Sequence, residues 1–271
     1  MIVEEIRCKS ILTKSGIAGV DYAINPYVGC QHGCVYCYAV FMKRFTGHRE
    51  EWGHFVDVRV NAAEVLARQL KRARAGSIML SSVTDAYQPL ERKYGISRAC
   101  LEVLCHHPAF TVSILTKSDL VLRDLDILHQ LQQVEVAFTI TTLDDEIRRR
   151  FEPKAPPVST RLDALAQLAE AGIATWAFYG PALPYLSDSE ERMEALFQEL
   201  KQVGVSYILV DSMNLRGAMW GRVRACLEEY YPELVDDYQL LSIDRRGYSR
   251  MLAQRARRIA DRLGLVCEVE C

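Results

Sequence analysis

The sequence predicts an α/β fold in which short buried strands alternate with amphipathic helices. Between residues 77 and 210, apolar β-branched runs are separated by helical patterns of roughly 10–15 residues. This alternation is typical of βαβ units that form a parallel sheet with right-handed crossovers. No Gly-x-Gly-x-x-Gly run follows the first strand, which argues against a dinucleotide-binding doubly wound sheet and favours a barrel or partial barrel.

The expected elements follow one another in a regular order. Residues 22–28 form the first strand, and a cysteine-rich loop comes directly after it. Because the working end of a parallel barrel is where its strands end, this loop is expected at that end. Further strands are expected at residues 77–81, 111–115, 134–140, 173–179 and 206–210, and helices at residues 97–106, 121–132, 160–171 and 189–203.

Residues 215–271 are expected to form a short α/β extension packed on the barrel of residues 1–214. The extension contains a helical pattern at residues 220–230, a breaker at Pro232 and a basic helix at residues 247–263. A short strand is expected at residues 265–269.

Composition limits the class of protein. A chain of 271 residues with 49% hydrophobic residues can bury a substantial core, and its net charge of −2 implies no strong overall attraction to nucleic acid or anionic membrane. No apolar run approaches a membrane span, and the N-terminus has no signal-peptide pattern, so a cytoplasmic protein is expected. In that compartment nine cysteines suggest metal or redox chemistry rather than disulfides.

The most informative motif is a C-x3-C-x2-C loop formed by Cys30, Cys34 and Cys37. An iron–sulfur cube takes four thiolates, so three cysteines leave one iron open to a small molecule. A zinc site completed by His32 or His48 is an alternative, as is a redox pair of Cys34 and Cys37.

The loop resembles the signature of the radical S-adenosylmethionine (SAM) superfamily, and the chain is similar to the branch that contains spore photoproduct lyase. The resemblance implies a six-unit (β/α)6 partial barrel and a [4Fe–4S] cluster whose open iron chelates SAM. It also implies an electron from a reductant such as flavodoxin or ferredoxin, and a 5′-deoxyadenosyl radical that takes a hydrogen atom from the substrate. Nucleic acid as that substrate rests on analogy alone. The matching stretches are residues 22–39, 81–91, 114–118, 139–144 and 178–181.

The resemblance suggests several SAM-binding residues near the strand ends. Tyr38 is expected against the adenine, with a packing role as the alternative. Ser82, Thr84 and Asp85 are expected near the amino acid portion of SAM.

Three further SAM contacts are expected on the next two strands. Lys117 is expected to pair with the SAM carboxylate, because a lysine at this end is costly to bury without an anionic partner. Thr139 or Thr141 is expected to reach the ribose hydroxyls.

Tyr36 and Tyr38 bracket the last cysteine of the loop and are candidate catalytic residues. In spore photoproduct lyase a similar tyrosine pair, together with a cysteine, returns a hydrogen atom to the product radical. Here residues 77–91 contain no cysteine, which argues against photoproduct repair. The tyrosines are then either relays or packing residues.

Cysteines elsewhere leave two other functions open. Cys8, Cys267 and Cys271 lie near the chain ends, which often meet in compact domains, so they are candidate ligands of a second cluster. A sulfur-inserting or modifying radical SAM enzyme would use such a cluster. A non-enzymatic zinc-binding interaction module is the third hypothesis.

The basic runs at residues 68–74 and 148–150 are interpreted as solvated helix faces. The arginines of the C-terminal helix are interpreted as a surface helix balanced by acidic residues, with phosphate-backbone binding as the alternative. They are Arg245, Arg246, Arg250, Arg255, Arg257, Arg258 and Arg262.

Overall fold

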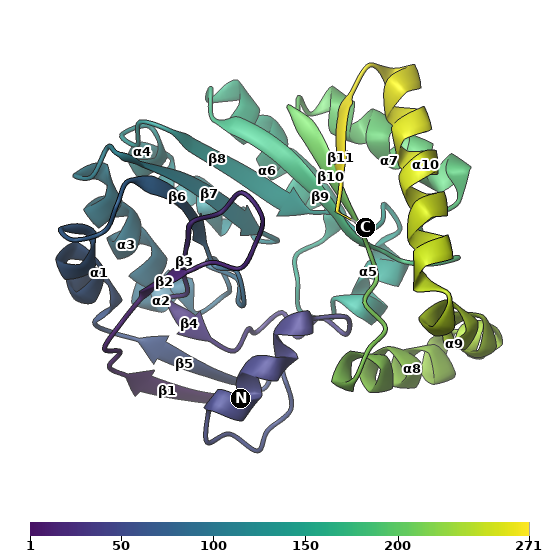
Figure 1. The fold of residues 1–271 in the computed structure, drawn as a ribbon, viewed down its shortest axis with the longest axis horizontal. Coiled ribbons are helices and arrows are strands. Elements are labelled where there is room, and N and C mark those ends of the chain that lie inside the picture. Colours follow the sequence, from purple (N-terminus) through teal and green to yellow (C-terminus); the bar gives the residue numbers. More distant parts are fainter. Residues whose placement is uncertain (271) are drawn as a thin grey trace.

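The computed structural model describes residues 1–270, and its centre is an eight-stranded sheet (Figure 1). All neighbouring strands in it are parallel except β2 and β3. The parallel sheet confirms the predicted α/β class, but the sheet is open, because β11 and β2 are its two ends. In spatial order the strands are β11 (Val266–Val269), β10 (Tyr207–Ser212), β9 (Ala174–Ala182), β8 (Val134–Thr139), β7 (Phe110–Thr116), β6 (Gly76–Leu80), β3 (Tyr22–Ile24) and β2 (Leu12–Lys14).

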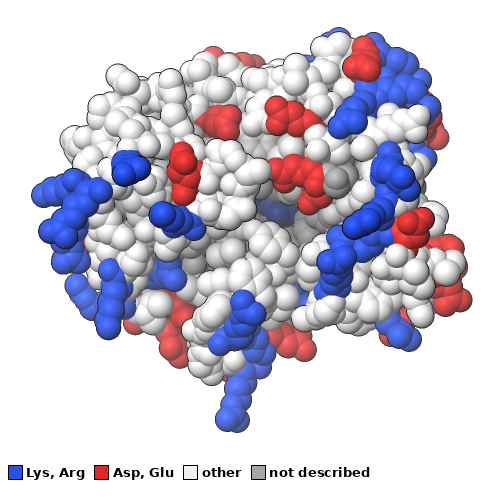
Figure 2. Space-filling view, in the orientation of Figure 1, with Lys and Arg blue, Asp and Glu red and all other residues white. Residues whose placement is uncertain are grey.

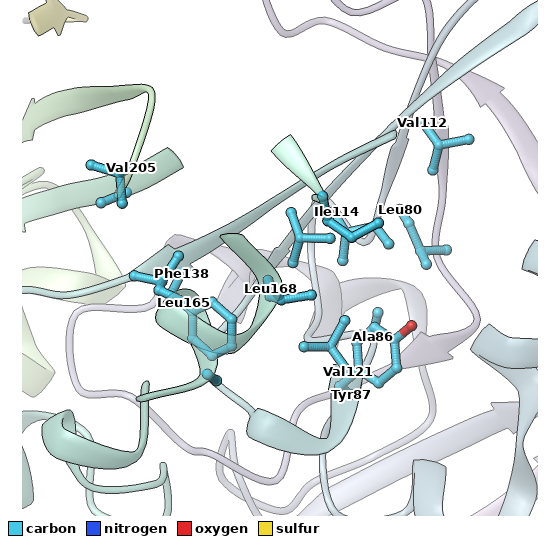
Figure 3. Packing of buried hydrophobic residues seen from close by; sticks show 14 of the residues in the cluster. Leu80, Ala86, Tyr87, Val112, Ile114, Val121, Phe138, Leu165, Leu168 and Val205 are labelled. Atoms are coloured by element: carbon cyan, nitrogen blue, oxygen red, sulfur yellow. The ribbon is translucent and has the colours of Figure 1, made fainter. Parts of the chain in front are cut away.

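One face of the sheet forms the main core. Ile24, Leu80, Ile114 and Val136 occupy matching positions in four adjacent strands, and all four are fully buried. Figure 3 shows Leu80 and Ile114 beside the helical residues Leu165 and Leu168. Burying each such side chain contributes about 1.5–3 kcal/mol to folding, so this face fixes the strand register.

Helices cover that face in the order in which they leave the strands (Figure 1). The helix predicted at residues 121–132 is shorter than expected and divides into η2 and α4. The covering helices are α1 (Ala62–Leu70), α3 (Ile96–Cys105), η2 (Asp119–Asp124), α4 (Leu125–Leu128), α6 (Val158–Glu170), α7 (Glu190–Gln202) and α10 (Arg245–Leu263).

The opposite face carries alternate residues of the same strands. Met79, Ser113 and Glu135 pair across β6, β7 and β8, and all three line one large cavity. Side chains alternate between the two faces of a strand, so the register that buries the core also aims these residues into the cavity.

The first predicted strand, residues 22–28, is wrong as one element. It divides at Asn25-Pro26 into β3, in the main sheet, and β4 (Tyr27–Val28), in a second sheet of order β1-β5-β4. Pro26 has no amide hydrogen to donate to a sheet, and the Asn25 carboxamide oxygen accepts from the Val83 amide at 3.0 Å. The sequence did not predict the other two strands, β1 (Ile2–Ile6) and β5 (Phe55–Arg59).

The last part of the chain returns to the sheet. The predicted strand near residues 265–269 is confirmed as β11, parallel to β10, and α10 packs against α7. Within residues 1–270, no helix is both long and apolar enough to cross a membrane. The remaining helices are η1 (Tyr38–Phe45), α2 (Glu91–Tyr94), α5 (Asp145–Phe151), α8 (Ala218–Tyr230), η3 (Pro232–Leu234) and α9 (Val235–Ile243).

Candidate functional site

A cavity of about 1220 Å³ lies against the inner face of the sheet and the cysteine-rich loop. Figure 2 shows the face on which the molecule is hollowed, with a basic side chain in the depth of the hollow and acidic side chains along its upper edge. Among the described residues that line the cavity, Lys117 is the only lysine or arginine. The three cysteines of the predicted motif line the same cavity.

Cys30, Cys34 and Cys37 are free thiols that suit a multi-iron cluster. Burial raises the pKa of all three and brings that of Cys34 to about 12, so binding as thiolates needs a strongly positive partner. Within residues 1–270, the one group of three potential metal-ligand atoms that lie within 4.8 Å of one another comes from Glu4, His48 and Asp57, not from the three cysteines. A cluster in which each thiolate binds its own iron does not require the three sulfurs to lie so close.

Glycines allow the loop to pack tightly against the segment before β5. Gly29 has φ 92°, and a β-carbon there would lie 2.4 Å from the Phe55 carbonyl oxygen. A β-carbon on Gly53 would lie 2.8 Å from the α-carbon of Gly33. Any larger residue at these positions would push the two segments apart.

Polar side chains from the segment after β6 hold the loop in place. The Thr84 hydroxyl donates to the Gly29 carbonyl at 2.6 Å, and the Gln88 side chain accepts from the Gln31 amide at 2.9 Å. Gln31 in turn accepts from the Leu90 amide at 2.6 Å. Thr84 lines the cavity, but its hydroxyl donates to the loop backbone, so it shapes the site through that backbone.

Asp85 is buried in a network of donors from its own protein. Its carboxylate accepts from the Thr116 hydroxyl at 2.7 Å and from the Lys117 amide at 3.0 Å, and His32 Nδ1 lies 3.3 Å away. Burial opposes ionisation, but His32 and Thr116 outweigh it and lower the pKa of Asp85. Asp85 is therefore an anion, and its carboxylate holds His32 in place beside the cysteines.

A second buried network, which the sequence did not predict, lies on the other side of Lys117. Glu152 and Arg161 form an ion pair in which both side chains are fully buried. Glu152 also accepts hydrogen bonds from the hydroxyls of Tyr36 and Thr141. Burial opposes ionisation of Glu152, but Arg161 and Lys117 outweigh it and lower its pKa.

Lys117 lies between these networks and remains a cation. Its Nζ is 5.9 Å from the centroid of the Tyr36 ring. Burial alone would lower the pKa of Lys117, but Cys34 and Glu152 outweigh burial and raise it. Lys117 is half-buried, and among the described residues its ammonium group donates no hydrogen bond. A half-buried cation that lines a cavity suits an anionic ligand group.

The other predicted residues differ in how they meet the cavity. Tyr38, half exposed, donates its hydroxyl to the Ser82 carbonyl and stacks on Phe41. Ser82 and Thr139 line the cavity. Thr141 is not among the lining residues, because its hydroxyl faces Glu152.

The predicted second cluster is not seen in the described residues. Cys8 exchanges backbone hydrogen bonds with the Asn61 side chain, whereas Cys267 lies on β11. Figure 1 shows the segment between β1 and β2 well apart from β11. Cys271 lies outside the described residues.

His48, one candidate zinc ligand, is engaged away from the cavity. Its Nε2 lies 2.6 Å from Asp57, and its ring stacks on Phe55 with centroids 4.3 Å apart. His32, the other candidate, does line the cavity.

Comparison with known proteins gives one family. Residues 24–200 match the family model described as the radical SAM superfamily. An uncharacterized protein of Methanocaldococcus jannaschii is 34% identical over 238 residues, covering 88% of this chain and 86% of its own. One of Mycobacterium tuberculosis is 32% identical over 267 residues, covering 93% and 78%. Spore photoproduct lyase complexed with dinucleoside spore photoproduct has a similar fold, with a TM-score of 0.75 at 17% identity over 99% of this chain and 82% of that one.

Proposed function

The chain belongs to the radical SAM superfamily, and from this premise we propose that it cleaves SAM reductively at a [4Fe–4S] cluster held by Cys30, Cys34 and Cys37. When bound, the cluster supplies one electron to the SAM sulfonium, which gives methionine and a 5′-deoxyadenosyl radical that takes a hydrogen atom from the substrate. The open sheet then acts as a partial (β/α)6 barrel, with residues 215–271 as an extension on it.

Three free thiols and one half-buried ammonium line a single cavity, and this arrangement carries the proposal. Lys117 is the natural partner for the SAM carboxylate, because its charge is maintained by Cys34 and Glu152 rather than by a salt bridge of its own. Ser82 and Thr139 line the cavity nearby and supply hydroxyls for the polar groups of SAM. Asp85 contributes by positioning Thr116 and the Lys117 backbone.

We propose that Tyr36 and Tyr38 act in hydrogen transfer. Burial raises the pKa of Tyr36 well above its ordinary value and that of Tyr38 to about 12, so both phenols stay neutral and keep a hydrogen atom to give. Tyr36 is aimed at Glu152, which fixes its ring beside Lys117. In Tyr36→Phe and Tyr38→Phe variants we expect SAM cleavage to persist while deuterium exchange between labelled SAM and substrate falls.

The substrate remains a proposal by analogy. Spore photoproduct lyase has been crystallised with a dinucleoside, which favours a nucleic-acid component. The arginines of α10 give little support, because Arg258 pairs with Glu190 at 2.6 Å and Arg262 pairs with Glu194 at 3.0 Å. A sulfur-inserting enzyme would need Cys8 and Cys267 to share a cluster, and they lie on separate elements.

Anaerobic reconstitution with iron and sulfide tests the proposal. We expect about four irons per chain and 5′-deoxyadenosine from SAM on reduction with dithionite, with flavodoxin or ferredoxin as candidate protein donors. Cys34→Ala should lose iron and cleavage. Cys105→Ala, a half-buried thiol on α3 outside the cavity, is the matched control and should keep both. Full cleavage by Cys34→Ala would refute the proposal.

A further inference from the structure

Two segments outside the sheet bring unpaired donors to the last cysteine of the loop. The first is the segment before β5, which is pressed against the cysteine loop at Gly53 and Gly33. The Lys154 ammonium donates to the Gly53 carbonyl at 3.0 Å and keeps the segment there. This packing buries Trp52 in one apolar cluster with Cys30 and Cys37.

The indole N–H of Trp52 lacks an acceptor. Trp52 is only 5% exposed, and its ring is fixed edge-on against Phe55 with centroids 5.9 Å apart and an interplanar angle of 84°. Its Nε1 is fully buried with no hydrogen-bond partner in the described residues. An indole nitrogen can only donate, and a buried donor without an acceptor is unfavourable, so the indole gains from a nearby acceptor such as the sulfur of a bound thiolate.

The second donor is Arg222 of α8. Its Nη2 donates to the Gly33 carbonyl at 3.2 Å, 189 residues away in the sequence, whereas its Nη1 is buried and finds no acceptor among residues 1–270. Its charge acts on the thiols of Cys34 and Cys37 and on the exposed carboxylate of Glu51. Trp52 and Arg222 thus approach the cysteine loop from two separate parts of the chain.

Both donors belong to residues packed on the cysteine loop. Trp52 shares an apolar cluster with Cys30 and Cys37, and both Trp52 and Cys37 line the cavity. Arg222 donates to the carbonyl of Gly33, the residue before Cys34, and α8 packs against η1, which begins directly after Cys37. Trp52 Nε1 and Arg222 Nη1 are therefore two unused donors beside the loop.

We propose that Trp52 and Arg222 are positioning residues that donate hydrogen bonds to sulfur on the Cys37 side of the cluster and thereby raise its reduction potential. This rests on the proposed function, since it requires the cluster. Reduction adds one negative charge, and hydrogen bonds and a nearby cation stabilise the more negative state. The inference gives the C-terminal extension a direct part in the cofactor site, through α8.

The test is an anaerobic redox titration of the reconstituted full-length protein without SAM, followed by the electron paramagnetic resonance signal of the reduced cluster. We expect the midpoint potential of Trp52→Phe and of Arg222→Gln to move to more negative values, and that of the double variant to move further. Arg222→Lys should retain part of the wild-type value, because it keeps the charge but not the fork of donors.

Two matched controls separate this effect from general disturbance. Trp176→Phe makes the same substitution in another buried tryptophan that lines the cavity, and Arg224→Gln removes an exposed arginine of α8 that pairs with Glu228. Neither should shift the potential. If Trp52→Phe holds no iron, the arginine variants decide the proposal by themselves.

The outcomes are distinguishable from failure of the proposed function. A wild-type protein that holds no cluster or does not cleave SAM contradicts the proposed function itself. A wild type that does both, with Arg222→Gln at an unchanged potential, overturns the inference alone. A shift of equal size in the two controls overturns it as well.

Discussion

The cysteine side of the cavity and the opposite wall differ in how their carboxylates are compensated by neighbouring groups. On the cysteine side, Asp85 has His32 and three hydrogen-bond donors, and Glu152 has Arg161. On the opposite wall, Asp211 faces Glu270, and burial together with that neighbour raises the pKa of Asp211 to about 6.

This difference indicates that the cysteine side is the preorganised half of the site. Fixed and compensated charges cannot rearrange easily, so the cysteine side presents one geometry to cluster and cofactor. On the other wall, burial and Glu270 raise the pKa of Asp211 although the Ser212 amide and Arg245 oppose the rise. Four acidic side chains line that other wall: Glu135, Asp211, Glu268 and Glu270.

Breaking the buried pair on the cysteine side should have the largest effect. Arg161→Met leaves Glu152 without its cation in a fully buried position, and removing one partner of such a pair destabilises by about 3–5 kcal/mol. Urea unfolding of the apoprotein measures the change. Glu228→Gln breaks the exposed pair with Arg224 and is the control, with an expected change of about 0.3–0.5 kcal/mol. Equal losses in both variants would contradict the contrast.

Removing the half-buried cation Lys117 should affect ligand binding rather than folding. Lys117→Met eliminates the charge that we assign to the SAM carboxylate, and losing a hydrogen bond to a charged group weakens binding about 10–100-fold. Equilibrium dialysis of the reconstituted protein with labelled SAM measures this. Lys154→Met removes a lysine whose ammonium donates to the Gly53 carbonyl, in the segment before β5. It should change SAM affinity much less than Lys117→Met does. Unchanged affinity in Lys117→Met would remove that residue from the SAM site.

Removing a carboxylate charge should change the stability of the folded protein in opposite directions on the two walls. The folded-state pKa of Asp211 is raised, so its stabilising protonated form is present at low pH and lost as pH rises through about 6. Asp211→Asn should therefore stabilise the protein at pH 7.5, by about 1–2 kcal/mol after allowance for solvent screening, and hardly at all at pH 4.

Asp85→Asn is the matched change on the cysteine side. The folded-state pKa of Asp85 is lowered, so its contribution is present above its ordinary pKa and lost as pH falls below it. This variant should be destabilised at pH 7.5. Thermal unfolding of both variants at the two pH values measures the signs, and the same sign in both at pH 7.5 would contradict the comparison.

The smallest effect is expected away from both walls. Figure 2 shows basic side chains gathered along the right of this face, where α10 runs in Figure 1. Arg258→Gln breaks an exposed pair with Glu190 and should change stability by less than about 1 kcal/mol. If the variant instead lost binding to a single-stranded oligonucleotide in a salt-dependent manner, the surface-helix interpretation of α10 would be replaced by a nucleic-acid surface.

Local patterns predicted much of the fold and the centre of the site. The strands β6 to β10 and the helices α3, α6 and α7 lie within a few residues of their expected positions, because their apolar spacing reflects burial on a single face. The three cysteines and Lys117 were predicted from their types and their places after strands. The break at Asn25-Pro26 was missed, since a run of apolar residues does not show that its two halves join different sheets.

By itself, the sequence determined the cysteine motif, the parallel α/β order and the superfamily, because these depend on neighbours in the chain. The tertiary structure alone decided which charges compensate one another. Tyr36 meets Glu152 across 116 residues and Arg222 meets Gly33 across 189, and no local pattern marks such partners. A buried charge or donor is stable only where folding brings its complement, so the environment of the cluster ligands is a property of the folded chain.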